Sequence, residues 1–148
     1  GSYGGYMTML AITKAPHVCS AGISLYGVSD WTVFVKQNQR KLWRMGLISK
    51  LGEPDKNPAR YERAAAIEFA ADAVSPLLIL QGADDDGEVR AQGESLYDAM
   101  KKAGKTVEYA IYWGEGHGFR HVGSQRDLYT RTEAFLSRHN VRKVPLTE

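Results

Sequence analysis

The segment VSPLLILQGADDDGE, residues 74–88, is the stretch from which the fold can be inferred. Its centre, Leu77 to Leu80, is a continuous apolar run after a proline, which is typical of a β-strand buried on both faces. Acidic residues and glycine follow at once, so a loop must begin where the strand ends. Because such a strand needs helices on both faces of its sheet, the segment predicts an α/β fold with a parallel sheet.

Two further strands are expected, one before and one after this segment. Residues 19–30, CSAGISLYGVSD, hold a short apolar run, and residues 106–113 alternate in the manner of a strand. Helical patterns occur at 5–15, at 31–50 with a break, at 59–72, at 92–103 and at about 125–139, and residues 52–58 read as a loop. Strands that alternate with helices imply βαβ units, hence a sheet of about three parallel strands with flanking helices.

The composition narrows the classes of partner. The chain has 148 residues, enough for one domain, and its net charge of +2 gives no reason to expect a nucleic-acid partner. No apolar run is long enough for a membrane span, so we expect no membrane partner. The single cysteine, Cys19, excludes an intrachain disulfide and is interpreted as a small core residue. No signal peptide is visible, so we expect a cytoplasmic protein, and we expect it to need no metal and no cofactor.

Residues that carry chemistry follow the expected strands. Parallel α/β sheets hold their functional groups in the loops at the carboxyl ends of strands. The three aspartates at 84–86 follow the central strand, His117 follows the last one, and Ser2 stands where a strand that this chain lacks would end. Serine, aspartate and histidine in this order are the pattern of an α/β-hydrolase triad. In such a triad the imidazole takes the serine proton and the carboxylate orients the imidazole.

The first residues, GSYGGY, have two interpretations. Gly-Ser at a terminus is a common cloning remnant, but Ser2-Tyr3-Gly4-Gly5 is also what remains of a G-x-S-x-G-G nucleophile turn cut after its first glycine. The matching aspartate and histidine loops favour the second interpretation. In it Gly4 is the small residue that lets strand and helix approach, and the backbone N–H of Tyr3 is one oxyanion donor.

Taken together, SYGGY, PLLILQGADDD and YWGEGHGF resemble the catalytic domain of the prolyl oligopeptidase family of serine peptidases, from residue 1 to about 140. The resemblance implies the C-terminal portion of an α/β-hydrolase catalytic domain over residues 1–140, a tail at 141–148, and a peptidase that works through an acyl-enzyme. It makes Ser2 the nucleophile and His117 the general base. Counting from Gly82 makes Asp85 the triad acid, whereas counting back from the next apolar residue makes it Asp86; we favour Asp85 and keep Asp86 open.

The chain departs from the family pattern at two positions. The family usually has a histidine where this chain has Gln81. It often has a polar or basic substrate-binding residue two positions after the acid, where this chain has Gly87. The second departure argues against a dedicated clamp for the N-terminal side of a substrate.

An apolar specificity pocket is implied by the segment VSDWTVF, residues 28–34, which resembles the pocket lining of dipeptidyl-peptidase-like members of the family. By this resemblance Trp31 and Phe34, with Tyr3, hold a proline-sized or other apolar side chain of a peptide or small ester substrate. Trp31 and Phe34 are equally compatible with a plain hydrophobic core.

The resemblance also implies that the N-terminal strands of the domain are missing here and that the three remaining strands are contiguous. A bare apolar sheet edge recruits another chain, so we expect a homodimer or association with an upstream segment. We expect little activity and little labelling of Ser2 by a fluorophosphonate in the isolated chain, because one oxyanion donor lies outside it. Two alternatives stay open: a carboxylesterase on the same fold, and a non-catalytic module that only self-associates.

Overall fold

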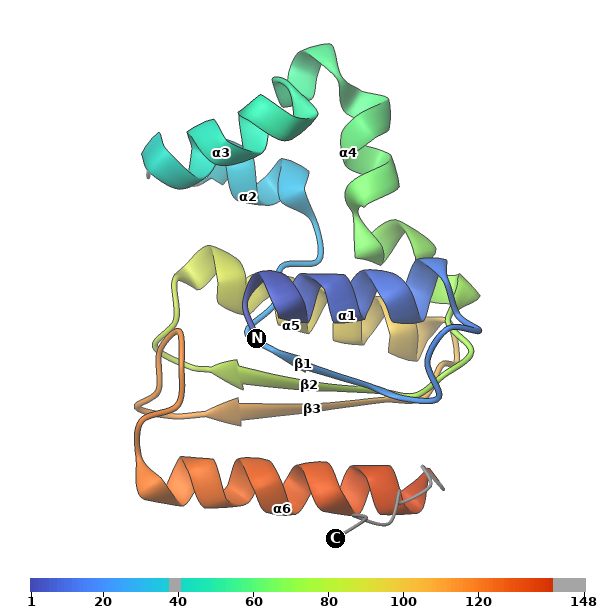
Figure 1. Ribbon diagram of the computed structural model, residues 1–148, viewed down its shortest axis with the longest axis vertical. Coiled ribbons are helices and arrows are strands. Elements are labelled where there is room, and N and C mark those ends of the chain that lie inside the picture. Colours follow the sequence, from blue (N-terminus) through green and yellow to red (C-terminus); the bar gives the residue numbers. More distant parts are fainter. Residues whose placement is uncertain (38–40, 140–148) are drawn as a thin grey trace, which may run out of the picture.

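The computed structural model describes residues 1–37 and 41–139, so the expected tail at 141–148 lies outside the described residues. Its centre is a three-stranded parallel sheet in the order β1 (Gly22–Leu25), β2 (Leu77–Gly82), β3 (Val107–Tyr112). Leu77 of β2 pairs with Gly22 on one side and with Val107 on the other. The predicted α/β fold and its three contiguous parallel strands are confirmed (Figure 1).

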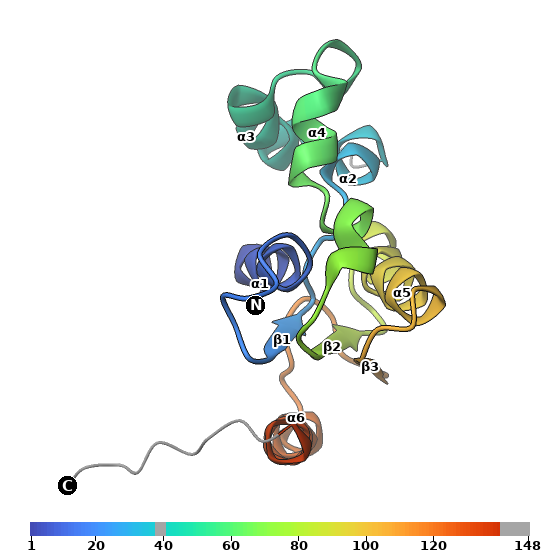
Figure 2. The same ribbon diagram turned by 90° about the vertical axis from the view of Figure 1, so that its right-hand side faces the viewer.

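The central strand β2 is buried along its whole length, as its apolar run predicts. Leu77 and Ile79 pack on one face of the sheet, whereas Leu78 and Leu80 pack on the other. The first face is covered by α1 (Tyr3–Lys14), the 3₁₀ segment η2 (Ala66–Asp72) and α5 (Gly87–Lys102), and the second by α6 (Val122–Arg138). Figure 2 shows α1 and α5 on one side of the strands and α6 on the opposite side.

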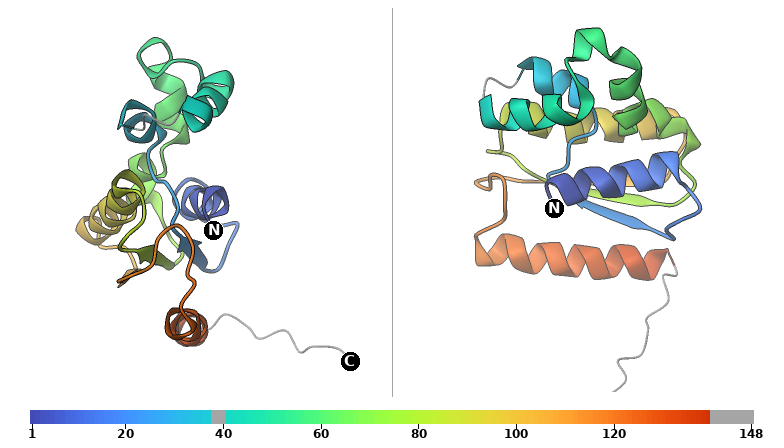
Figure 3. Two further views of the ribbon diagram at one scale, coloured as in Figure 1. Left: turned by 90° about the vertical axis from the view of Figure 1, so that its left-hand side faces the viewer. Right: turned by 45° about the horizontal axis from the view of Figure 1, so that its top comes forward.

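Short helices form a third layer above α1 and α5. This layer contains α2 (Trp31–Gln37), α3 (Lys41–Leu51), the 3₁₀ turn η1 (Pro54–Lys56) and α4 (Pro58–Ala64) (Figure 3). Its aromatic residues, with Tyr6 of α1 and Val89 of α5, make a separate hydrophobic cluster. A break was expected within 31–50; the segment between α2 and α3, residues 38–40, lies outside the described residues. None of the helices in the described part of the chain is both long and apolar enough to cross a bilayer.

Three local predictions are wrong. Residues 59–72 are not one helix, because the chain extends at Ala65 (φ −90°, ψ 111°) and continues as η2, whose alanines pack closely against α1. The helix expected from residue 92 already begins at Gly87. Cys19 is exposed and not part of the core, because it lies in the loop between α1 and β1.

Candidate active site

The first turn of the chain holds Ser2 in a strained conformation. Ser2 has φ 54° and ψ −121°, and α1 starts at the following residue. A positive φ costs a non-glycine residue about 1–3 kcal/mol and persists only where the surroundings impose it. Here the Ser2 N–H donates to the carbonyl of Leu25 at the end of β1 (2.9 Å), and the Ser2 carbonyl accepts the N–H of Tyr6 (3.0 Å). The serine side chain is thereby held at the carboxyl edge of the sheet.

Close packing of α1 against the end of β1 depends on two glycines. A Cβ atom on Gly5 would lie 2.8 Å from the Leu25 carbonyl oxygen, and one on Gly27 would lie 2.6 Å from the backbone of Gly5. The Ser24 hydroxyl also donates to the Gly5 carbonyl (3.1 Å). The interpretation of Gly4 as the close-approach glycine is not met in this chain, since a Cβ there meets no described atom within 4 Å. The position that faces β1 is that of Gly5, one residue later.

The loop after β3 brings His117 to the same edge. Gly82 at the end of β2 allows this, because a Cβ there would lie 2.3 Å from the Gly116 carbonyl oxygen. The loop is also tied to the turn after β2, where the Asp84 N–H donates to the Glu115 carbonyl (2.8 Å). The positive φ of Gly118 (129°) turns the chain sharply after the histidine.

The carboxylate of Glu115, 2% exposed, fixes the second half of this loop. It accepts the backbone N–H groups of Arg120 (2.8 Å) and His121 (2.9 Å), and it lies 3.0 Å from Nδ1 of the His121 ring. Burial by itself would raise the pKa of Glu115, but these donors and the Ser124 hydroxyl lower it to about 2. Glu115 is therefore ionised at neutral pH and holds the loop that carries His117.

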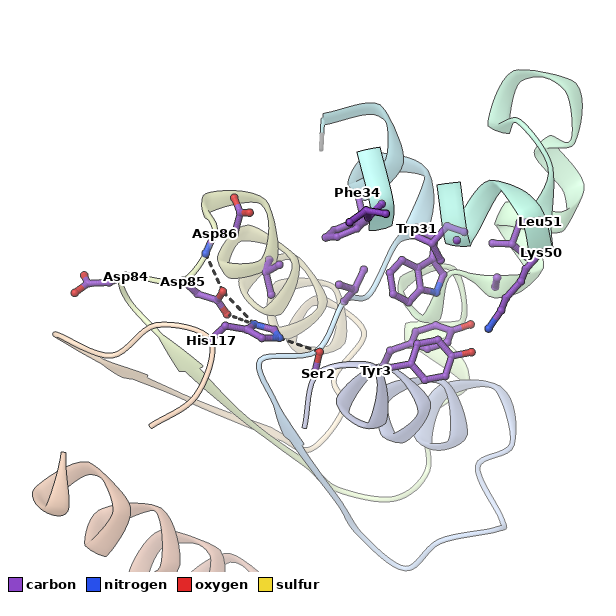
Figure 4. A pocket seen from close by; sticks show the side chains of 17 residues that line it. Ser2, Tyr3, Trp31, Phe34, Lys50, Leu51, Asp84, Asp85, Asp86 and His117 are labelled. Carbon is purple, nitrogen blue, oxygen red and sulfur yellow. Dashed lines mark hydrogen bonds and ion pairs between the residues drawn. The ribbon is translucent and has the colours of Figure 1, made fainter. Parts of the chain in front are cut away.

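Ser2, His117 and Asp85 form one hydrogen-bonded chain (Figure 4). The His117 Nε2 atom lies 2.8 Å from Ser2 Oγ, and Nδ1 lies 3.1 and 3.0 Å from the two oxygens of Asp85. The Asp85 carboxylate is 2% exposed, whereas the His117 side chain is 45% exposed and open to the cavity. The carboxylate of Asp86 is turned away from the ring in Figure 4, so the geometry favours Asp85 as the partner of His117.

Two further donors hold the Asp85 carboxylate. The Asp86 N–H donates to Oδ1 (2.8 Å), and the side-chain amide of Gln81 donates from Nε2 to Oδ2 (2.8 Å). Gln81 itself is fully buried at the end of β2. These two donors therefore fix the orientation of the carboxylate that contacts His117.

Tyr3 occupies the first position of α1, directly after Ser2. The first N–H groups of a helix have no acceptor within that helix and carry a partial positive charge. The backbone N–H of Tyr3 is thus placed next to the Ser2 hydroxyl with the character needed to bind an anionic oxygen. The Tyr3 side chain, 53% exposed, extends into the cavity described next.

A cavity of about 690 Å³ opens beside Ser2 and His117. Tyr3, Trp31 and Phe34 all line it, and Trp31 and Phe34 also belong to the hydrophobic cluster of the third layer. The rings form a continuous series: Trp31 is stacked on Tyr3 (centroids 6.0 Å apart) and edge-on to Phe34 (5.5 Å). Burial raises the pKa of Tyr6, whose ring meets Trp31 edge-on at 4.9 Å.

The aromatic wall is joined by charged groups at the cavity's margins. Lys50 of α3 lies 5.8 Å from the centre of the Tyr3 ring, and the carboxylates of Asp84 and Asp86 line the cavity near His117. The cavity therefore has an apolar middle, one cationic flank and an acidic turn.

Sequence reasoning assigned no role to three residues that contact or support this site. Gln81 could have been found as a polar residue ending an apolar strand, and Glu115 as the carboxylate inside the glycine-rich histidine loop. Tyr26, whose ring packs 4.8 Å from the His117 ring, gave no signal, because its role depends on an unusual φ of 42° at the end of β1. No group of three metal-ligating side chains occurs within residues 1–37 and 41–139.

Comparisons with known proteins find a family model, curated relatives and solved structures that are all described as peptidases. The model of the "Prolyl oligopeptidase family" matches residues 1–141. The chain is 30% identical over 142 residues to dipeptidyl peptidase family member 6 of Caenorhabditis elegans, covering 92% of this chain and 19% of that protein. It is 28% identical over 150 residues to dipeptidyl aminopeptidase BIII of Pseudoxanthomonas mexicana, covering 93% of this chain and 20% of that protein.

A solved structure of a puromycin-hydrolyzing peptidase from Mycobacterium tuberculosis is similar over 100% of this chain and 22% of its own length, with a TM-score of 0.88 and 27% identity. The chain thus spans about a fifth of the length of the relatives it matches.

Proposed function

Since the chain belongs to the prolyl oligopeptidase family, we propose that its Ser2, His117 and Asp85 form the catalytic triad of a serine peptidase that works through an acyl-enzyme. One observation carries the proposal: a single imidazole lies within hydrogen-bond distance of both the serine hydroxyl and a buried carboxylate. This is the arrangement that converts a weak hydroxyl nucleophile into a reactive one.

In the acylation step the Ser2 oxygen attacks the carbonyl carbon of the substrate, and His117 Nε2 takes the hydroxyl proton. Asp85 stabilises the resulting imidazolium through Nδ1 and stays ionised. The carbonyl oxygen becomes an oxyanion, for which the Tyr3 N–H and the N-terminus of α1 provide positive charge. When the C–N bond breaks, the proton on Nε2 passes to the leaving amine and the acyl group remains on Ser2.

Deacylation repeats these steps with water as the nucleophile. His117 removes a proton from the water molecule as it attacks the ester, and then returns a proton to Ser2 as the acid product leaves. The exposure of the His117 ring on the cavity side lets water approach Nε2 while Nδ1 remains anchored to the buried carboxylate.

The substrate class follows from the cavity. Three aromatic rings next to Ser2 suit a compact apolar side chain, such as proline, at the residue whose carbonyl is attacked. The names of the relatives, a dipeptidyl peptidase and a dipeptidyl aminopeptidase, support a peptide amide as the bond that is cleaved.

Hydrolysis of paired substrates tests the proposal. The protein, expressed at the length at which it occurs naturally, is assayed with proline-linked dipeptide anilides and with short-chain p-nitrophenyl esters, beside its Ser2→Ala and His117→Ala variants. We expect hydrolysis of the anilides and a loss of about 10³-fold or more in kcat for each variant.

Each other outcome has a definite meaning. Ester hydrolysis without anilide hydrolysis would replace the peptidase by a carboxylesterase on the same triad. Activity that survives both substitutions, or its absence with every substrate, would contradict the proposal and favour a non-catalytic module.

A further inference from the structure

The strand β2 ends in a buried polar side chain that its apolar sequence does not require. Gln81 follows four apolar residues and is itself 0% exposed. Its Nε2 donates to Asp85 Oδ2 (2.8 Å), whereas its Oε1 is buried and has no hydrogen-bond partner among the described residues. A polar atom that is buried without a partner lowers stability, so an apolar residue would suit the fold better at this position.

The orientation of this amide is fixed by Asp85. An ionised carboxylate only accepts hydrogen bonds, so the NH₂ group must face it, and a reversed amide would bring two acceptor oxygens together. Oε1 must then point the other way, toward Gly93 of α5, where a Cβ atom would lie 3.5 Å from it. The unpartnered oxygen is thus a direct consequence of using the amide to bind the carboxylate.

The two donors hold the carboxylate symmetrically about His117. Oδ1 accepts the Asp86 N–H and Oδ2 accepts the Gln81 amide, each at 2.8 Å. His117 Nδ1 lies almost equally far from both oxygens, at 3.1 and 3.0 Å. Without Gln81 only the Oδ1 side keeps a donor of its own, so the carboxylate can turn and the imidazole loses its fixed direction toward Ser2.

We propose that Gln81 is a positioning residue of the triad: its side-chain amide holds the Asp85 carboxylate, and through it the His117 ring, in the orientation that activates Ser2. This inference rests on the proposed function. A purely structural role for Gln81 would act on stability and leave the direction of the imidazole unchanged.

Two substitutions at residue 81 distinguish these roles. Gln81→Met keeps the size of the side chain and removes the donor. We expect kcat to fall by about 10- to 100-fold with little change in KM, since a hydrogen bond to a charged group is lost where it acts on the imidazole. The melting temperature should change little, because removing the unpartnered oxygen offsets the lost hydrogen bond.

Gln81→Glu tests the same role through pH, because the activity of this variant relative to the wild type should fall as the pH rises. The introduced carboxyl lies beside a second buried carboxylate, which keeps it protonated above its ordinary range, and in that form it still donates to Asp85. We expect kcat relative to the wild type to be near unity at about pH 6 and to fall about 10-fold or more by about pH 9, where the donor proton is lost. The other titratable groups near residue 81 and in the cavity are the same in both proteins: Asp85, His117, Tyr109 of β3, Asp84, Asp86, Lys50, Tyr3 and Tyr6.

Gln92→Met is the matched control, since Gln92 is also a buried glutamine but binds the 29–30 backbone instead of Asp85. Gln92→Met should raise KM, and its kcat relative to the wild type should not change with pH. A Gln81→Met variant with wild-type kcat, or a Gln81→Glu variant whose relative kcat does not depend on pH, would overturn the proposal.

A readout that needs no turnover separates this inference from the proposed function. The downfield proton NMR signal of His117 Nδ1–H reports the hydrogen bond to Asp85 in each variant that folds. We expect it to shift or broaden in Gln81→Met and to stay unchanged in Gln92→Met; an unchanged signal in both would refute the role of Gln81. If the wild-type protein hydrolyses nothing, the proposed function fails, yet this measurement still decides the role of Gln81.

Discussion

At the scale of single residues, the site depends on two positions, Gly5 and Gly27, where the backbone contacts leave no room for a side chain. Ser2 keeps its strained φ because α1 lies directly against the end of β1, and Gly5 and Gly27 make that contact possible. The sequence pattern predicted that a glycine near the serine permits close approach, but it assigned this role to Gly4. Which of two adjacent glycines faces the strand depends on the helical phase of α1, and spacing alone does not set that phase.

The two glycines therefore make a matched pair for mutation. Gly5→Ala should destabilise the chain by about 1–3 kcal/mol or more, because its Cβ would lie 2.8 Å from a backbone oxygen that cannot move aside. Gly4→Ala, whose Cβ meets no described atom within 4 Å, should be neutral or stabilise by up to about 1 kcal/mol. Urea unfolding of both variants measures the difference; equal effects would show that α1 does not contact β1 as described.

The lowered pKa of Glu115 predicts that the stability of the protein depends on pH. Its folded-state pKa of about 2 lies below the ordinary value of 4.5, so between these values the folded protein binds fewer protons than the unfolded chain. The stabilisation is fully present above about pH 4.5 and is lost as the pH falls toward about 2.

We therefore expect Glu115→Gln to lower the free energy of unfolding at neutral pH and to converge with the wild type near pH 2. Glu62→Gln, which removes an exposed carboxylate of α4, is the control and should show no such convergence. Denaturant unfolding at a series of pH values measures both. A constant difference between Glu115→Gln and the wild type at all pH values would show that the carboxylate charge does not hold the loop.

At the scale of elements, the strands were predictable and the helix boundaries were not. A short continuous apolar run between turn residues is typical of a strand in the centre of a covered sheet, so β2 followed from the sequence. The alternation of residues 106–113 gave β3 in the same way. The division of 59–72 into α4 and η2 did not, because it depends on tertiary contacts: Ala66 and Ala70 pack against α1, and the Ile67 N–H binds the Ser29 carbonyl. The same holds for Trp31 and Phe34, which serve both as core and as cavity wall.

One interelement contact is open to a direct test. Gln92 of α5 accepts the backbone N–H groups of Ser29 (3.0 Å) and Asp30 (2.6 Å), and Asp30 in turn accepts the Thr32 N–H at the start of α2 (2.7 Å). Gln92→Met should release this loop, which precedes Trp31. We expect about 1–3 kcal/mol of lost stability and a higher KM for substrates with an apolar side chain, measured by unfolding and by initial rates. An unchanged KM would mean that the loop does not shape the cavity.

At the scale of the whole molecule, the outer edge of β1 is the part of the sheet most open to pairing with another chain. β1 pairs with β2 on one side, and no strand of the described residues pairs with its other side. On that side the Leu25 carbonyl accepts the Ser2 N–H, while the alternation of the strand directs the N–H of Ile23 outward. Bare strand edges of this kind recruit further chain.

We accordingly predict that the 148-residue chain self-associates through the outer edge of β1. Ile23→Pro removes the outward donor without removing a hydrogen bond to β2, and should shift the chain toward a monomer. Analytical ultracentrifugation measures the association, and far-UV circular dichroism verifies the fold of the variant. A wild-type chain that sediments as a stable monomer would contradict the prediction.

The central claim, that His117 activates Ser2, is tested most directly by covalent labelling of the protein expressed at the length at which it occurs naturally, and not of the 148-residue chain alone. A fluorophosphonate reacts with an activated serine, and mass spectrometry of the labelled peptides identifies the residue. The account predicts that the label is on Ser2 and that the labelling rate falls by about 10³-fold or more in His117→Ala. Label on a different residue, or a rate at Ser2 that does not depend on His117, would contradict it.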